Sequence, residues 1–259
     1  RILSQEDIEN NTQLPIVGNI MHSNDETELS VFRNPKSNIA ESFRELRTNL
    51  EFMLPDRKTH VISIHSTNPG EGKSYNSINL GTILAMRKPK LHKIFDLNNN
   101  KGLSTYLIGH DGFDQVIFPT DINNLSVLPS GPIPPNPAEI LSKQSMKDLI
   151  ELAGQQFDYI ILDNAPVALV TDGIIVSRLS DLNIFILRFG VSHTHQLELI
   201  NQYAETKKVN NIGLIVNDIK ASAMGNGYYK YYQYEEYKKS YYSDEETGTK
   251  SKRKKKNRA

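Results

Sequence analysis

The stretch 61-VISIHSTNPGEGKSY-75 decides the fold, because an apolar run ends in a glycine-bearing turn that closes with Gly-Lys-Ser. We predict a buried strand over residues 60–66 and a helix from about Ser74 to Ala85. A strand, a glycine turn and a helix in this order are the setting of a phosphate-binding P-loop. Glycines let backbone N–H groups close around phosphate oxygens, and the helix N-terminus adds positive potential.

Within this loop Lys73 is predicted to reach the β- and γ-phosphates of ATP, and the Ser74 hydroxyl to bind Mg²⁺. The strict pattern places glycine seven positions before the serine, where this chain has Thr67. An ordinary strand-to-helix turn that happens to contain GKS is the alternative, and the flanking strand and helix favour the P-loop. The predicted nucleotide-binding residues are Pro69, Gly70, Glu71, Gly72, Lys73, Ser74 and Tyr75.

A P-loop needs a second metal carboxylate at the end of a neighbouring strand, and 157-FDYIILDNAP-166 supplies Asp163. We predict that Asp163 holds Mg²⁺ through water, beside Ser74, and that it acts with Lys73 in catalysis. The alternative is that Asp163 only ends a strand or caps a helix. Asp172 begins the next predicted helix, where a simple N-cap and a role near the nucleotide are equally open.

Outward from the P-loop, apolar runs alternate with helical stretches, which predicts an α/β fold with a doubly wound, mostly parallel sheet of the P-loop type. Continuous apolar runs suit strands that are buried on both faces of such a sheet. We expect a polar loop over 21–37 and a helix after it, with Asn38 as its cap and Glu41 completing a capping box. The other expected strands are 14–20, 125–128, 158–163, 183–188 and 212–217, and the other expected helices lie near 138–155, 171–180 and 193–208.

Composition excludes several classes of function. The chain has 259 residues with 30 Lys+Arg and 30 Asp+Glu, so no overall basic field indicates a nucleic-acid partner. It has no cysteine, which excludes disulfides and thiolate chemistry. We find no apolar run long enough to span a bilayer and no signal peptide, and the start at Arg1 suggests a piece of something longer.

The C-terminal part has a different composition. Its last ten residues, 250-KSKRKKKNRA-259, are strongly basic. A solvated, disordered end is the preferred interpretation, and contact with anionic lipid is the alternative.

Tyrosines are concentrated in the stretch that precedes this basic tail, with Lys, Glu, Gln, Ser and Gly around them and no aliphatic residue to build a core. Such a cluster serves aggregation, base stacking or phosphorylation. Glu235 and Glu236 disfavour stacking on nucleic acid, and the nearby nucleotide loop favours phosphorylation. The predicted phosphoacceptors are Tyr228, Tyr229, Tyr231, Tyr232, Tyr234, Tyr237, Tyr241 and Tyr242.

These features divide the chain into three predicted parts. Residues 1–37 form an N-terminal strand and linker, residues 38–221 a P-loop domain, and residues 222–259 a flexible tyrosine cluster with a basic tail.

From about Leu14 to Tyr242 the chain resembles the cytoplasmic kinase domain of the bacterial tyrosine autokinases of capsule and exopolysaccharide export. The resemblance rests on the joint order of several motifs, since each alone is weak. They are 41-ESFRELR-47, the GEGKS loop, 101-KGLSTYL-107, 128-LPSGPIPPNPAEIL-141, 157-FDYIILDNAPV-167 with Thr171-Asp172, and the tyrosine cluster.

The resemblance implies a Walker-type kinase that uses ATP and Mg²⁺ to phosphorylate the tyrosine tail of a neighbouring copy. It also implies a homo-oligomeric ring, with Glu41, Arg44 and Arg47 at the subunit interface. The implied partners are a transmembrane polysaccharide co-polymerase segment, either its own or a separate one, and a tyrosine phosphatase. The implied location is the cytoplasmic face of the bacterial inner membrane.

One family motif is missing. After the P-loop helix the family has a strand ending in Asp-x-Asp-x-Arg, whose aspartates position Mg²⁺ and activate the tyrosine hydroxyl, whereas here 82-TILAM-86 runs directly into 87-RKPKLHKIF-95. Asp96 follows this segment and is not an equivalent. Either residues are missing from the sequence after Met86, or the protein lacks the motif; the cost of deleting a central strand favours the first explanation. The general base therefore has no assignment. Asn164-Ala165 also replaces the family's Thr/Ser-Pro.

Three functions follow from these observations. The first is a protein-tyrosine autokinase. The second is an ATPase switch of the ParA/MinD type, which has no need of the tyrosine cluster. The third is a ring scaffold that binds nucleotide without turnover, which the missing motif keeps open.

Overall fold

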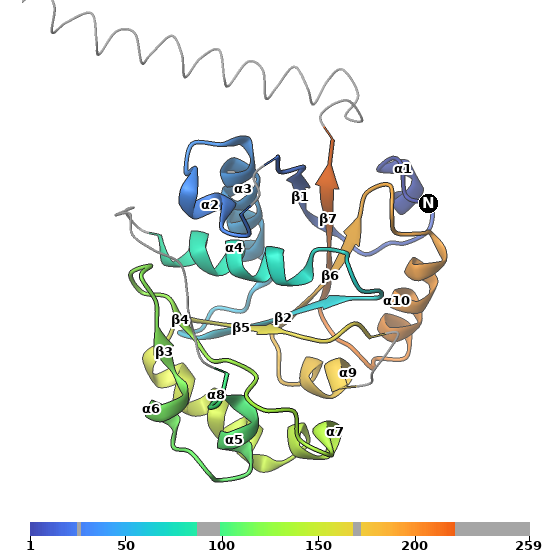
Figure 1. The fold of residues 1–259 in the computed structure, drawn as a ribbon. Helices are drawn as coiled ribbons and strands as arrows, with labels where there is room; N and C mark the ends of the chain where they lie inside the picture. The colour runs from blue at the N-terminus through green and yellow to red at the C-terminus, as the bar shows by residue number, and fades with distance from the viewer. Residues whose placement is uncertain (25–26, 87–98, 168–171, 221–259) are drawn as a thin grey trace, which may run out of the picture. The chain divides into compact units, whose positions relative to one another are not determined.

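A five-stranded sheet with every neighbouring pair parallel forms the centre of the fold, as predicted (Figure 1). The computed structural model describes residues 1–24, 27–86, 99–167 and 172–220. The P-loop strand β2 lies between β6 and β5, and the strand order is β1-β7-β6-β2-β5. The strands are β1 (Ile16–Met21), β2 (His60–Ser66), β5 (Tyr159–Asp163), β6 (Leu182–Arg188) and β7 (Ile212–Ile219).

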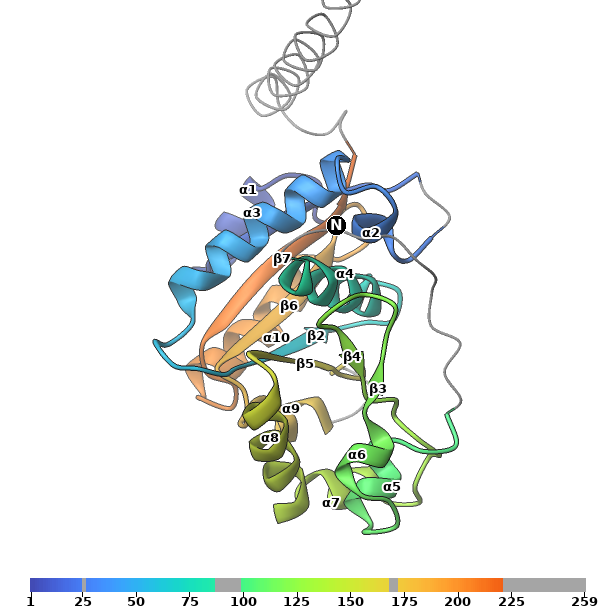
Figure 2. The ribbon, with the colours of Figure 1, turned by 90° about the vertical axis from the view of Figure 1, so that its left-hand side faces the viewer.

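Helices cover both faces of this sheet. α3 (Asn38–Met53) packs on β1 and on α4 (Lys73–Ala85), and α4 lies over β2 and β5. On the other side, α8 (Gln144–Gln156) contacts β5 and α9 (Asp172–Ser177) contacts β2, as Figures 1 and 2 show. α10 (His195–Glu205) joins β6 to β7. The arrangement is the predicted doubly wound α/β fold.

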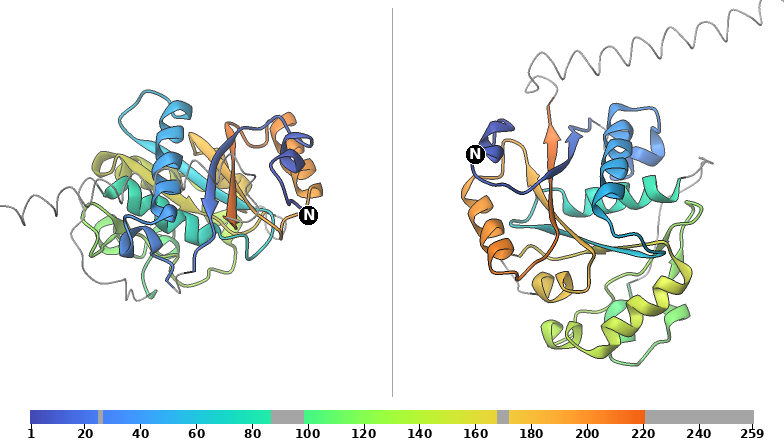
Figure 3. Two further views of the ribbon diagram at one scale, coloured as in Figure 1. Left: turned by 90° about the horizontal axis from the view of Figure 1, so that it is seen from above. Right: turned by 180° about the vertical axis from the view of Figure 1, so that it is seen from behind.

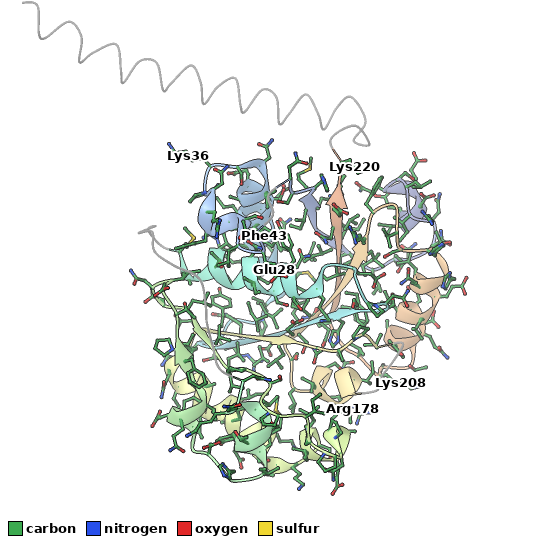
Figure 4. All side chains as sticks on the ribbon, in the orientation of Figure 1. Glu28, Lys36, Phe43, Arg178, Lys208 and Lys220 are labelled. Carbon is green, nitrogen blue, oxygen red and sulfur yellow. The ribbon has the colours of Figure 1, made fainter. Side chains whose placement is uncertain are left out.

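The core lies between the sheet and helices α3 and α4. Phe43 of α3, labelled in Figure 4, is fully buried. Its ring centre lies 6.3 Å from that of Tyr75 of α4. Leu46, Ile62 and Ile184 belong to the same buried cluster. Burying one such side chain contributes about 1.5–3 kcal/mol, so this cluster fixes the position of α4, which carries the end of the P-loop.

The register of the strands shows which residues lie together at the carboxyl ends of β2, β5 and β6. Ile64 of β2 is paired with Asp163, the last residue of β5, and Ser66 is paired with Ile186 of β6. β1 runs beside β7 at the far edge, as the view from above in Figure 3 shows. Because all five strands are parallel, their carboxyl ends meet at one edge of the sheet, where ligands bind in open α/β folds.

The strand predicted at 125–128 is present in part, as β4 (Ser126–Val127), but its expected place in the parallel sheet is wrong. It pairs antiparallel with Phe118–Pro119 (β3) in a separate two-stranded ladder. The partner lies a few residues upstream, and closing so short a loop costs less entropy than pairing with a distant strand. An apolar run alone does not say which partner a strand will take.

Helix boundaries give three further corrections. The stretch 138–155 is two helices, α7 (Pro137–Leu141) and α8, because Lys143 is extended and the Ser142 hydroxyl donates to the Glu139 carbonyl. The expected loop 21–37 contains α2 (Ser30–Arg33). The cap of α3 is Ser37, not Asn38: Ser37 is extended, and its hydroxyl accepts from the Ala40 amide at 3.2 Å.

Residues Arg1–Ile219 form one compact unit. Its remaining helices are α1 (Glu6–Glu9), α5 (Leu103–Leu107) and α6 (Phe113–Val116). Among the described residues, every helix is too short or too polar to cross a membrane. The segment after Met86, where the Asp-x-Asp-x-Arg strand was expected, and the tyrosine cluster lie outside the described residues. The three-part division of the chain stays a prediction.

Candidate functional site

The P-loop joins β2 to α4 through backbone conformations that favour glycine. Gly70 and Gly72 have φ values of 80° and 93°, in the left-handed region that side chains disfavour. Gly72 directly precedes the first helical residue, Lys73. A Cβ on Gly72 would also lie 2.0 Å from the Asn217 amide nitrogen, so the position excludes a side chain on two grounds. The strand, turn and helix predicted from the sequence are all present.

Three predicted residues meet at this edge of the sheet. The Lys73 ammonium lies 3.0 Å from Asp163 Oδ1, and the Ser74 hydroxyl donates to Asp163 Oδ2 at 2.6 Å. Lys73 and Asp163 keep 14% and 37% of their side-chain surface exposed, so this trio can be reached from solvent. The structure thus brings together residues 90 positions apart in the chain.

The Ser74 hydroxyl and the Asp163 carboxylate are hard oxygen donors at an open edge, which fits Mg²⁺. This ion is usually held by one or two carboxylates and by substrate phosphates rather than by a protein cage. Among the described residues no group of three or more His, Cys, Asp or Glu side chains could hold a metal by itself. The donor set therefore fits a metal that arrives with a phosphate ligand.

The loop after Asp163 is fastened to the sheet. The Asn164 side-chain amide donates to the Ile64 and Leu162 carbonyls at 3.1 Å and 3.0 Å. This asparagine, which departs from the family's pattern, holds the end of β5 against β2. Asp172 begins α9 as expected, but its side chain lies outside the described residues.

Behind the loop lies a buried carboxylate that sequence reasoning placed in the loop without assigning a role to its side chain. Glu71 is 1% exposed. Its carboxylate accepts from the Asn68 amide at 2.9 Å, the Ser192 hydroxyl at 2.5 Å, the Gln196 side chain at 2.8 Å and the Thr67 hydroxyl at 3.2 Å. Four donors offset the cost of burying this carboxylate. Ser192 and Gln196 carried no motif in the sequence.

Two side chains from the ends of β6 and β7 bind main-chain oxygens of the same loop. Asn217 donates to the Glu71 carbonyl at 3.0 Å, and Arg188 donates to the Gly70 carbonyl at 2.9 Å. Arg188 also binds Asp218 at 2.8 Å, and together with the Asp218 contact to His22 it lowers the pKa of Asp218 against the opposing effect of burial. The loop is therefore held from β6 and β7 as well as from β2.

His65 is the next-to-last residue of β2, the strand that leads into the P-loop. Burial lowers its pKa to about 4, so the ring is neutral at physiological pH. Nε2 lies 3.0 Å from Asn183 Oδ1, and the ring stacks on Phe185 at 4.9 Å. The Asn183 side-chain NH2 donates to the Ser177 and Asn210 carbonyls, so its oxygen accepts a hydrogen bond from the protonated Nε2. The apolar run 61-VISIH-65 did not indicate that His65 would be buried and hydrogen-bonded to Asn183.

The remaining predicted residues have contacts of their own. The Tyr75 side chain packs against the core beside Phe43, so a nucleotide contact by Tyr75, which stays a prediction, would come from its main chain. Arg44 forms an ion pair with Glu41 at 2.6 Å and donates to the Pro35 carbonyl. Arg47 donates to the Ile83 carbonyl at 3.3 Å, near the end of α4. An intermolecular role for Glu41, Arg44 and Arg47 stays a prediction.

Comparisons with known proteins agree with this geometry, although no family model matches the chain. Tyrosine-protein kinase ptk of Acinetobacter johnsonii is 35% identical over 242 residues, which cover 84% of this chain and 33% of the relative. Tyrosine-protein kinase YwqD of Bacillus subtilis (strain 168) is 35% identical over 208 residues, covering 75% of this chain and 88% of the relative. The solved kinase domain of Escherichia coli tyrosine kinase ETK matches with a TM-score of 0.74 and 27% identity, covering 84% of this chain and 94% of that domain. The chain thus spans a third of the first relative and most of the second.

Proposed function

The chain belongs to the family of bacterial tyrosine-protein kinases, and we propose that it is an ATP-dependent autokinase that phosphorylates the tyrosine cluster of neighbouring subunits. The observation that carries this proposal is the convergence of Lys73 and Ser74 of the P-loop on Asp163 at the carboxyl edge of the sheet. This arrangement serves phosphoryl transfer, where catalysis is mostly positioning and charge stabilisation.

Each residue has a defined part. Lys73 binds the β- and γ-phosphates and offsets the charge that develops during in-line transfer to a tyrosine hydroxyl. Ser74 and Asp163 are the residues that would hold Mg²⁺, which supplies further charge neutralisation when it is bound. The backbone amides of the glycine loop bind phosphate oxygens, aided by the N-terminus of α4. The general base belongs to the missing motif and has no assignment among the described residues.

The acceptors are the tyrosines of 228-YYKYYQYEEYKKSYY-242, which the sequence places beyond the last strand. Each phosphate adds nearly two negative charges at neutral pH, so phosphorylated tails repel one another. We expect this repulsion to favour disassembly of a homo-oligomeric ring. Glu41 and Arg44 remain partly exposed, which leaves them accessible for contacts between subunits.

The family also suggests the setting of the reaction. We place the domain at the cytoplasmic face of the bacterial inner membrane, with a transmembrane co-polymerase segment of its own or from a separate chain. Phosphorylation would regulate exopolysaccharide polymerisation and export, and a tyrosine phosphatase would reset the tail. Nothing in the composition calls for a nucleic-acid partner.

The deciding experiment is the intact mass of the purified protein before and after incubation with Mg·ATP. We expect stepwise addition of phosphoryl groups that map to Tyr228–Tyr242, and no addition in Lys73→Met. A variant with all eight cluster tyrosines replaced by phenylalanine is the matched control, since it keeps the nucleotide site and lacks the acceptors. ATP hydrolysis without phosphate on the wild-type tail would instead identify an ATPase switch. Nucleotide binding and ring assembly without turnover would identify a scaffold.

A further inference from the structure

Side chains from the ends of β6 and β7 fix the direction of the P-loop peptide groups. Asn217 holds the Glu71 carbonyl and Arg188 holds the Gly70 carbonyl. The described residues contain no cis peptide bond, and a trans peptide points its N–H opposite to its C=O. Side chains from β6 and β7 bind these two carbonyls, so the amides of Glu71 and Gly72 point away from Arg188 and Asn217.

The Glu71 carboxylate fastens the same peptide to the protein. Its four donors come from the loop itself, from the segment after β6 and from the first turn of α10. All three side-chain donors (Thr67, Ser192 and Gln196) are buried. Ser192 also accepts from the Arg188 amide at 2.8 Å, so the cluster continues into the end of β6. A satisfied buried polar network of this kind specifies one geometry.

Thr67 stands where the strict P-loop pattern has glycine, and the contacts of its hydroxyl give a structural reason for this departure. Its φ is outside the left-handed region, so no glycine is required there. Its hydroxyl accepts from Gln196 and donates to Glu71, which closes a ring of three side chains. A glycine at this position would open the ring.

We propose that Glu71 is a positioning residue, which, tied to Thr67, Gln196 and Asn217, aims the P-loop amides at the phosphates before nucleotide binds. The inference rests on the proposed function, because it takes ATP as the ligand. It adds that affinity for ATP depends on a side chain that faces away from the nucleotide.

Charge and geometry predict opposite results for Glu71→Gln. Removing a buried negative charge near a phosphate site would tighten ATP binding if charge alone mattered. Positioning predicts weaker binding, because in either orientation the new NH2 group of the glutamine faces another donor, the Asn68 backbone N–H or the Gln196 side-chain NH2. We expect the KM for ATP to rise about tenfold, as for loss of one buried hydrogen bond, with kcat for tail phosphorylation within about twofold of wild type.

A pair at Thr67 keeps the test decisive if Glu71→Gln does not fold. Thr67→Val has the same shape without the hydroxyl, and Thr67→Ser restores the hydroxyl. We expect the KM for ATP to rise about fivefold in Thr67→Val and to stay within about twofold in Thr67→Ser. Thr67→Gly, which recreates the strict P-loop pattern, should behave like Thr67→Val. Thermal unfolding of each variant without nucleotide is measured in parallel.

The outcomes separate the inference from the proposed function. A wild-type protein that neither binds Mg·ATP nor phosphorylates its tail overturns the proposed function. A wild-type kinase whose Thr67→Val variant keeps its KM, or loses kcat at unchanged KM, overturns the inference alone, since the cluster would then only support folding. Improved affinity in Thr67→Gly or Glu71→Gln would overturn it as well.

Discussion

The two sides of the P-loop use polar side chains in opposite ways. On the β5 side, Lys73 and Ser74 bind an exposed carboxylate, Asp163, which can exchange these partners for a ligand. On the β6 side, Glu71 is 1% exposed, and donors that are themselves buried, among them Ser192 and Gln196, bind its carboxylate. The residues of the exposed side must be able to exchange their protein partners for a ligand. The residues of the buried side must keep theirs, so that the loop keeps its shape.

The largest expected effect comes from breaking the exposed side. Asp163→Asn removes the charge that Lys73 and Ser74 contact, and we expect the rate of tail phosphorylation to fall at least about a hundredfold. Stability should change by less than about 1 kcal/mol, because the side chain is 37% exposed and its ion pair is screened by solvent. Phosphotyrosine formation and urea unfolding measure the two quantities.

Asp158→Asn is the matched control, because this exposed aspartate directly precedes β5, which ends at Asp163. It should keep the wild-type rate. A similar loss of activity in both variants would show that the strand, and not the carboxylate at its end, was disturbed.

The exposed side was predictable from the sequence, and the buried side was not. Lys73 and Ser74 stand in a local pattern, a glycine turn between a strand and a helix, and this P-loop in turn gives a role to Asp163, an aspartate at a strand end. Gln196 and Asn217 contact Glu71 across 125 and 146 positions of the chain, and single polar residues at such separations carry no local signal.

The same reasoning explains the errors in the fold. Continuous apolar runs identified the parallel strands, because burial on both faces leaves its mark on each strand separately. The run at 125–128 has the same apolar pattern but pairs with β3, which lies upstream in the chain. Its own residues do not indicate which partner strand it takes. Ser37 and Asn38 are both good caps, and only the backbone conformation of Ser37 decides between them.

A second prediction concerns the buried side alone and uses pH. Burial holds the His65 pKa at about 4, below its ordinary value of 6.5, so the unfolded chain binds the proton more readily. Stability should therefore be complete above about pH 6.5 and fall as the pH drops toward 4, by on the order of 3 kcal/mol. Urea unfolding across this range measures the slope.

His65→Gln is the control, because a glutamine amide can still donate to Asn183 and does not titrate. The burial of His60 also lowers its pKa and acts in the same direction, so the difference between wild type and variant is the quantity to read. Equal slopes in the two proteins would remove His65 as a source of the pH dependence. Tail phosphorylation at pH 7.5 should differ little, since His65 is neutral at this pH and its replacement changes no charge near Lys73.

The smallest expected effect separates backbone strain from packing in the loop that joins the two sides. Gly72→Ala places a Cβ against the Asn217 amide and should cost about 2 kcal/mol in the free energy of unfolding. Gly70→Ala is the matched variant, because Gly70 shares the positive φ while nothing lies within 4 Å of its Cβ position. We expect it to cost about 1 kcal/mol, from strain alone. The excess in Gly72→Ala, measured by urea unfolding, is the contribution of Asn217 packing. Equal costs would mean that Asn217 yields to the new methyl group and that its hold on the Glu71 carbonyl is loose.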